Sequence, residues 1–216
     1  MINRPNYIEA IAPFIDQPLV KILAGIRRCG KSTIFEMLEE ELLRRGVPAD
    51  HIICKRYTEM DIPENITAKQ MYDELMVAMA DKGHCYLLLD EIQEIDGWEK
   101  AVNSLLEDAN TDIYVTGSNS KLLSGELATY LSGRYIQIQV FPFSLAEAKQ
   151  QCIENGTYTS DEKLFADYLK YGGFPQRFFL PDDHSITTYL DDLYEAIIVR
   201  DIMLRHNIRE QTALRN

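Results

Sequence analysis

Short apolar segments alternate with amphipathic helical segments along the first 140 residues of the chain. The helical segments begin at Lys31, after the capping pattern Thr67–Gln70, and at Trp98, each with apolar residues three or four positions apart. The apolar segments have the length of strands and cover residues 19–24, 51–57, 85–90 and 112–117. This alternation predicts βαβ units built around a parallel sheet.

The pattern between residues 135 and 140 is different. Isoleucine and valine at every second position alternate there with Gln137 and Gln139. Period-two alternation indicates a strand with one solvated face. We therefore expect a fifth strand near the edge of the sheet.

Only helical patterns follow Pro142. Residues 144–147 and 159–162 have the spacing of capping boxes, and residues 185–208 have the periodicity of one long helix. We expect an α/β core over residues 1–143 and a small helical lid or linker over residues 144–184. Residues 185–216 are expected to be the first helix of a C-terminal domain that is truncated in this chain.

Composition and charge narrow the classes of partner. The chain has 216 residues and a net charge of −12, and an acidic field repels phosphate backbones, so nucleic acid is an unlikely partner. Its longest apolar runs are far shorter than a membrane span, and the N-terminal pattern is not that of a secretory signal, so we expect a cytoplasmic protein. The four cysteines form no C-x-x-C pair, so we expect neither a disulfide framework nor a zinc site.

One motif carries specific chemistry. Residues 25–32 match G-x-x-x-x-G-K-[ST], with an expected strand before the match and a helix after it. Backbone N–H groups of such a loop wrap a phosphate, Lys31 bridges the β- and γ-phosphates, and the Ser32 hydroxyl can hold Mg²⁺. The alternative is a chance match in a glycine-containing turn. The predicted nucleotide-binding residues are Gly25, Ile26, Arg27, Arg28, Cys29, Gly30, Lys31, Ser32 and Thr33.

Cys29 allows two interpretations. Oxidation of its thiol could block nucleotide entry, or the residue could be a small side chain at an unconstrained position of the loop. The second interpretation is the simpler one.

Two adjacent acidic residues, Asp90 and Glu91, stand at the end of the apolar segment 85–90. Asp90 stands where open α/β sheets place ligands, and we expect it to complete the Mg²⁺ site with Ser32. Glu91 would orient or polarise the attacking water. Acids also commonly punctuate strand ends, which is the structural alternative. One strand candidate lies between the loop and these acids, which is the arrangement of additional-strand, catalytic-glutamate P-loop proteins.

Two further polar positions are candidate site residues. Ser118 and Asn119 follow the fourth strand, where a hydroxyl or amide could touch the γ-phosphate or its water, or could cap the next helix. Arg134 precedes the fifth strand and could stabilise transition-state charge in its own subunit or on a neighbour's nucleotide. The alternative for Arg134 is a surface ion pair.

These segments together resemble the prokaryotic AAA-type ATPases that carry a C-terminal domain of unknown function. The resemblance rests on residues 25–33, 87–93, 116–118, 133–134, 142–147 and 172–175. It implies an AAA+ fold with a five-stranded parallel sheet flanked by helices, ATP and Mg²⁺ binding, and hydrolysis. It also implies the sensor position for Ser118 and the finger-like position for Arg134, with self-association if that arginine acts on a neighbour. Residues 172–175 are similar to the Gly-x-Pro turn of signalling ATPases, which would place Pro175 near the adenine.

Three functions remain open from the sequence. The leading interpretation is a switch or assembly ATPase that cycles between ATP and ADP. A nucleotide-gated binding module with little or no hydrolysis is the second, and a P-loop kinase is a weaker third, because adjacent Asp90 and Glu91 suit a positioned water rather than an acceptor. The base-reading tetrapeptide of GTPases is absent from the sequence.

Overall fold

The computed structural model describes residues 2–58, 63, 65–118 and 130–197. Contacts divide the chain into two compact units. The sheet unit comprises Arg4–Gly25 and Lys31–Val140, and the helical unit takes in residues 2–3, Ile26–Gly30 and the described chain from Phe141. The predicted boundaries at residues 143/144 and 184/185 remain predictions.

The sheet unit contains one parallel sheet of five strands in the order β2-β3-β4-β1-β5. Its strands are β1 (Val20–Gly25), β2 (Ile52–Arg56), β3 (Cys85–Asp90), β4 (Thr111–Gly117) and β5 (Tyr135–Val140). The predicted α/β fold is confirmed. Among the described strands β5 pairs with β1 alone, which confirms the predicted edge position, and β4 lies between β1 and β3. The strand that carries Asp90 is therefore separated from the strand that leads into the glycine-rich loop.

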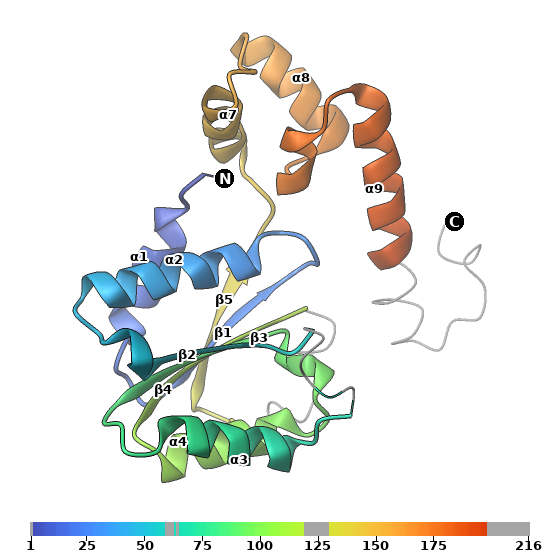
Figure 1. The fold of residues 1–216 in the computed structure, drawn as a ribbon. Coiled ribbons are helices and arrows are strands. Elements are labelled where there is room, and N and C mark those ends of the chain that lie inside the picture. The colour runs from blue at the N-terminus through green and yellow to red at the C-terminus, as the bar shows by residue number, and fades with distance from the viewer. Residues whose placement is uncertain (1, 59–62, 64, 119–129, 198–216) are drawn as a thin grey trace. The chain divides into compact units, whose positions relative to one another are not determined.

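Helices cover both faces of this sheet (Figure 1). On one face lie α1 (Pro5–Ile11) and α2 (Lys31–Arg44), and on the other lie α3 (Ala68–Met79) and α4 (Trp98–Asp108). The capping box at Thr67 is present: its hydroxyl accepts from Gln70 N–H while the Gln70 side chain accepts from Thr67 N–H. Met71, Leu75 and Met79 are buried against the sheet, as their spacing predicts.

A charged pair is buried at the N-terminal ends of β1 and β4. The Lys21 ammonium group donates to an Asp112 carboxylate oxygen, and both side chains are 0% exposed. The second Asp112 oxygen accepts from Asp16 N–H at 2.8 Å and from the Tyr114 hydroxyl at 2.7 Å. The local sequence patterns do not predict this pair, because each of its members lies inside an apolar strand.

The helical unit contains α7 (Leu145–Glu154), α8 (Asp161–Tyr171) and α9 (Asp183–Ile197). The capping box of residues 144–147 is confirmed at Ser144 and Glu147. The predicted box at residues 159–162 is wrong by one residue, because Ser160 is the cap and its hydroxyl accepts from Lys163 N–H. The predicted long helix begins at Asp183, and its residues beyond Ile197 lie outside the described residues.

Short 3-10 helices connect these elements: η1 (Ala12–Phe14), η2 (Ala49–His51), η3 (Ile92–Glu94) and η4 (Pro175–Phe179). The segment after α8 packs closely on the start of the helical unit. Phe143 N–H donates to the Gly173 carbonyl at 2.7 Å, and a Cβ at Gly173 would lie 2.0 Å from the Phe143 carbonyl oxygen. Only glycine allows this approach.

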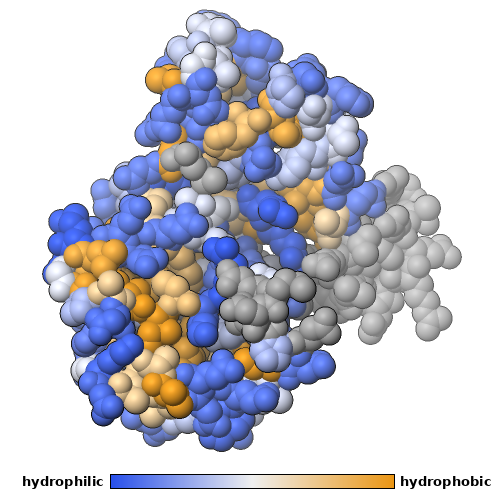
Figure 2. Space-filling model, viewed as in Figure 1, coloured by the Kyte–Doolittle hydropathy of each residue, from blue (hydrophilic) through white to orange (hydrophobic). Residues whose placement is uncertain are grey.

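Polar residues cover most of the face seen in Figure 2, and apolar residues gather near the end of α2 and the edge strand β2. Leu43, in the last turn of α2, is an apolar residue that is 43% exposed. Among the residues that the structure describes, no helix is both long and apolar enough to cross a membrane.

Candidate nucleotide site

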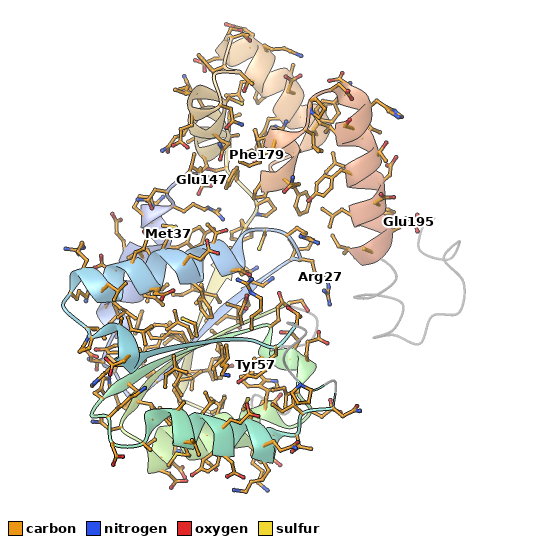
Figure 3. The ribbon with its side chains drawn as sticks, in the orientation of Figure 1. Arg27, Met37, Tyr57, Glu147, Phe179 and Glu195 are labelled. Carbon is orange, nitrogen blue, oxygen red and sulfur yellow. The ribbon has the colours of Figure 1, made fainter. Side chains whose placement is uncertain are left out.

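The glycine-rich loop joins the last residue of β1, Gly25, to the first residue of α2, Lys31. Within it, Cys29 N–H donates to the Ile26 carbonyl at 3.3 Å, and the Cys29 side chain is fully buried. Gly30 has φ 103°, a conformation that side chains with a Cβ rarely adopt. Arg28 also has a positive φ of 65°, and Arg27 extends from the same loop (Figure 3).

Two of the predicted metal ligands meet in the sheet unit. The Ser32 hydroxyl, in the first turn of α2, lies 2.7 Å from Asp90 Oδ2 at the end of β3. Asp90 is only 4% exposed. The pair supplies the hydroxyl and carboxylate oxygens that Mg²⁺ prefers. These residues therefore fit a magnesium ion, although 58 positions separate them in the chain.

Glu91 is held by three neighbours. Its carboxylate lies 3.7 Å from Lys31 Nζ and accepts from Gln93 Nε2 at 2.5 Å, while its backbone N–H donates to Thr116 Oγ1 at 3.0 Å. Lys31 also donates to the Gly25 carbonyl at 3.1 Å. Glu91 itself is left-handed, with φ 54° and ψ 42°. Non-glycine residues in this region are typical of functional sites, where the surrounding structure enforces the strain.

Three residues of this arrangement were not among the predicted site residues. Thr116, in β4, donates to Asp90 Oδ1 and accepts from Glu91 N–H, so it links both acids. Arg56, the last residue of β2, donates to Asp90 Oδ2 at 3.0 Å. Gln93 binds Glu91. The polar residues at the end of β4 indicated that this strand contributes to the site. Which of them contacts the two acids depends on the strand register, and the register brings Thr116 to them.

Four other predicted site residues are Ser118, Asn119, Thr33 and Pro175, and one of them lies outside the described residues. Ser118 follows β4 and is 1% exposed, and Asn119 lies outside the described residues. Thr33 is half-buried in the first turn of α2. Pro175 is buried at the start of η4 in the helical unit. For these four residues, the predicted roles remain predictions.

Arg134 lies at the opposite end of β1 from the glycine-rich loop. Its carbonyl accepts from the N–H of Val20, the first residue of β1, whereas the loop begins after Gly25, the last. Five residues of parallel strand span roughly 16 Å. The guanidinium forms an ion pair with Glu107 and donates to Asn103 at 3.1 Å. The structure therefore does not bring Arg134 together with Lys31, Ser32 and Asp90.

A five-stranded parallel sheet in this order, with a lysine and a hydroxyl opening the helix after β1 and an acid ending β3, defines the P-loop NTPase class. The chain belongs to the AAA domain family, whose pattern matches residues 17–149. It therefore contains an AAA-type P-loop ATPase domain.

Sequence relatives are longer than this chain. An uncharacterized protein of Haemophilus influenzae is 34% identical over 219 residues, covering all of this chain and 54% of its own length. The uncharacterized protein MJ1544 of Methanocaldococcus jannaschii is 32% identical over 226 residues and is covered over 48% of its length. The chain thus spans about half the length of the curated relatives it matches.

Solved structures share the fold. The Walker-type ATPase PABY2304 of Pyrococcus abyssi superposes with a TM-score of 0.63 and 17% identity, over 96% of this chain and 77% of that one. The Hsp104–ADP complex of S. cerevisiae superposes with a TM-score of 0.58 and 16% identity, over 99% of this chain and 36% of that one.

Proposed function

We propose that this chain binds ATP with Mg²⁺ and hydrolyses it, as a molecular switch or assembly ATPase. The observation that carries the proposal is the meeting of Ser32 with Asp90 at 2.7 Å and of Lys31 with Glu91 at 3.7 Å. Two segments distant in sequence thereby bring together the ammonium group of Lys31, the Ser32 and Asp90 oxygens and the Glu91 carboxylate. These are the groups that phosphate binding, metal binding and water activation require.

Each residue has a defined task in this proposal. Backbone N–H groups of Gly25–Thr33 bind the phosphates, and Lys31 leaves Glu91 to bridge the β- and γ-phosphates. Ser32 and Asp90 hold the Mg²⁺ ion, which supplies charge neutralisation when bound. Glu91 accepts a hydrogen bond from the attacking water and orients it. Thr116 fixes Asp90 and the backbone of Glu91.

A slowly hydrolysing regulatory module is the second candidate. Lys31 and Gln93 contact opposite oxygens of the Glu91 carboxylate, Oε1 and Oε2 respectively. Nucleotide binding would recruit Lys31, but Gln93 would still compete with a water for Glu91. This contact favours slow turnover that a partner could raise.

Steady-state phosphate release and nucleotide binding test both candidates. Glu91→Gln should bind ATP as the wild type does and lose at least about a hundredfold in turnover, in line with loss of a general base. Lys31→Ala should lose binding and turnover together. Gln93→Ala should raise turnover if Gln93 restrains Glu91. Wild-type turnover in Glu91→Gln would refute the assigned role of Glu91.

Self-association is a separate part of the proposal. Because Arg134 lies away from the phosphate-binding lysine of its own chain, a role in catalysis requires a second subunit. Activity per subunit should then rise with protein concentration and lose this dependence in Arg134→Ala. Constant specific activity in the wild type across the range in which it assembles would leave Arg134 as a surface ion pair.

A further inference from the structure

Arg56 lies where β2 meets the proposed metal site. It is the residue directly opposite Asp90 in the β2–β3 ladder, and its Nε donates to Asp90 Oδ2 at 3.0 Å. The Arg56 side chain is 44% exposed and that of Asp90 only 6%. The guanidinium therefore supplies positive charge to a buried carboxylate from the solvent side.

The backbone at this position is fixed, whereas the Arg56 side chain is partly exposed. The next residue, Tyr57, donates its N–H to the Asp90 carbonyl at 3.1 Å. Its ring is 7% exposed and belongs to the core cluster that α3 and α4 form with the sheet (Figure 3). Burial raises the pKa of the Tyr57 hydroxyl, in agreement with this apolar setting.

Asp90 Oδ2 has no lone pair left for a cation. This oxygen has two lone pairs, and it accepts from both Ser32 Oγ and Arg56 Nε. A cation held by Oδ2 needs one of these lone pairs. Ser32 can keep donating its proton to Asp90 while its own lone pair faces the cation. Arg56 has no acceptor and carries a positive charge, so Arg56 is the group that has to leave.

A place for the displaced guanidinium exists beside it. A cavity of about 130 Å³ lies between α2 and β2, and it is bordered by Arg56, Asp90 and Ser32. Glu36 and Glu39 of α2 line the same cavity. Two carboxylates within a side chain's length offer Arg56 an alternative partner.

We propose that Arg56 is a positioning residue that couples metal binding to nucleotide binding. It neutralises Asp90 in the metal-free protein and turns toward Glu36 and Glu39 when a divalent cation occupies the site. This inference rests on the proposed function, because it takes Asp90 as a metal ligand. Arg56 therefore competes with the cation for Asp90, and it is the partner of this carboxylate until the cation binds.

The test is the dissociation constant of a fluorescent ADP analogue, measured in EDTA and in saturating Mg²⁺. The dissociation constant in EDTA divided by the constant in Mg²⁺ measures the coupling between metal and nucleotide, and a larger ratio means stronger coupling. Arg56→Gln should raise this ratio by roughly two- to fivefold, the upper part of the range for an exposed ion pair. Arg56→Lys should stay near the wild-type ratio. Circular dichroism of each variant confirms folding.

Lys55→Gln is the matched control. It removes the same charge one residue earlier in β2, where Lys55 pairs with Leu89. Lys55 also borders the cavity, but strand alternation directs its side chain to the face of the sheet opposite that of Arg56. Its ratio measures the effect of lost charge alone. The double variant Glu36→Gln, Glu39→Gln should lower the ratio, because it removes the alternative partner of Arg56.

The outcomes separate the two proposals. If the wild type binds the ADP analogue in neither condition, the proposed function fails. If it binds, and Arg56→Gln changes the ratio no more than Lys55→Gln does, the coupling role of Arg56 is overturned while the proposed function stands. A ratio that falls in Arg56→Gln also overturns that role.

Discussion

Replacing Lys21 by methionine should destabilise the sheet unit strongly without altering the nucleotide site. The side chains of Lys21 and Asp112 are both 0% exposed, so the substitution leaves the Asp112 carboxylate buried without its cation. Two other donors, Asp16 N–H and the Tyr114 hydroxyl, remain on that carboxylate and soften the loss. Breaking a buried pair on one side costs about 3–5 kcal/mol, or roughly 6–20 °C in Tm for a chain of this size.

The assay uses the single tryptophan of the chain, Trp98, which is 3% exposed at the start of α4. Its fluorescence during urea unfolding reports on the sheet unit alone. Lys69→Met is the control, because Lys69 and its partner Asp73 in α3 are 74% and 55% exposed and such pairs contribute at most about 1 kcal/mol. The reasoning is refuted if Lys21→Met lowers the unfolding midpoint no more than Lys69→Met does.

Three shorter predictions concern other parts of the chain. Gly173→Ala should destabilise the helical unit by about 1–3 kcal/mol or more, because its Cβ would clash with the Phe143 carbonyl oxygen. Gly156→Ala has open space around it and should cost only about 1–2 kcal/mol, because of its positive φ. Hydrogen exchange in α7 and α8 compares the two variants. Hydrogen bonds from Arg44 and Arg45 lower the pKa of Glu41 to about 2, so its carboxyl NMR signal should titrate near that pH, and the stability from these pairs should be lost as pH falls from 4.5 toward 2. Thr116→Val should lower turnover at least about tenfold and Thr116→Ser far less, because valine leaves the Glu91 N–H and an Asp90 oxygen without a partner; phosphate release decides this.

Local patterns predicted the elements of the sheet unit well. The boundaries of the five strands lie within one residue of the predicted segments, and the stripe behind Thr67 is buried as expected. These features depend on periodicity and capping, which are properties of short segments. The helix α1 was not predicted, since it has only seven residues and no capping hydrogen bond from a side chain.

Contacts across the sheet could not be predicted in the same way. Arg56 meets Asp90, and Thr116 meets both acids, because parallel strands come into one particular register. A shift of one residue would move each side chain to the other face. The motifs therefore identified Lys31, Ser32, Asp90 and Glu91, whereas the residues that support them became visible only with the register.

The left-handed backbone of Glu91 has an implication for selection experiments. A residue with a Cβ pays about 1–2 kcal/mol to adopt this conformation, and glycine or asparagine is far better suited to it. Selection of a mutant library for heat resistance should therefore replace this glutamate. The selected variants should be more stable to heat and should have lost ATP hydrolysis. Thermal unfolding of Glu91→Gly beside Glu91→Gln would measure that trade-off directly, since both variants lose the carboxylate but only one relaxes the main chain.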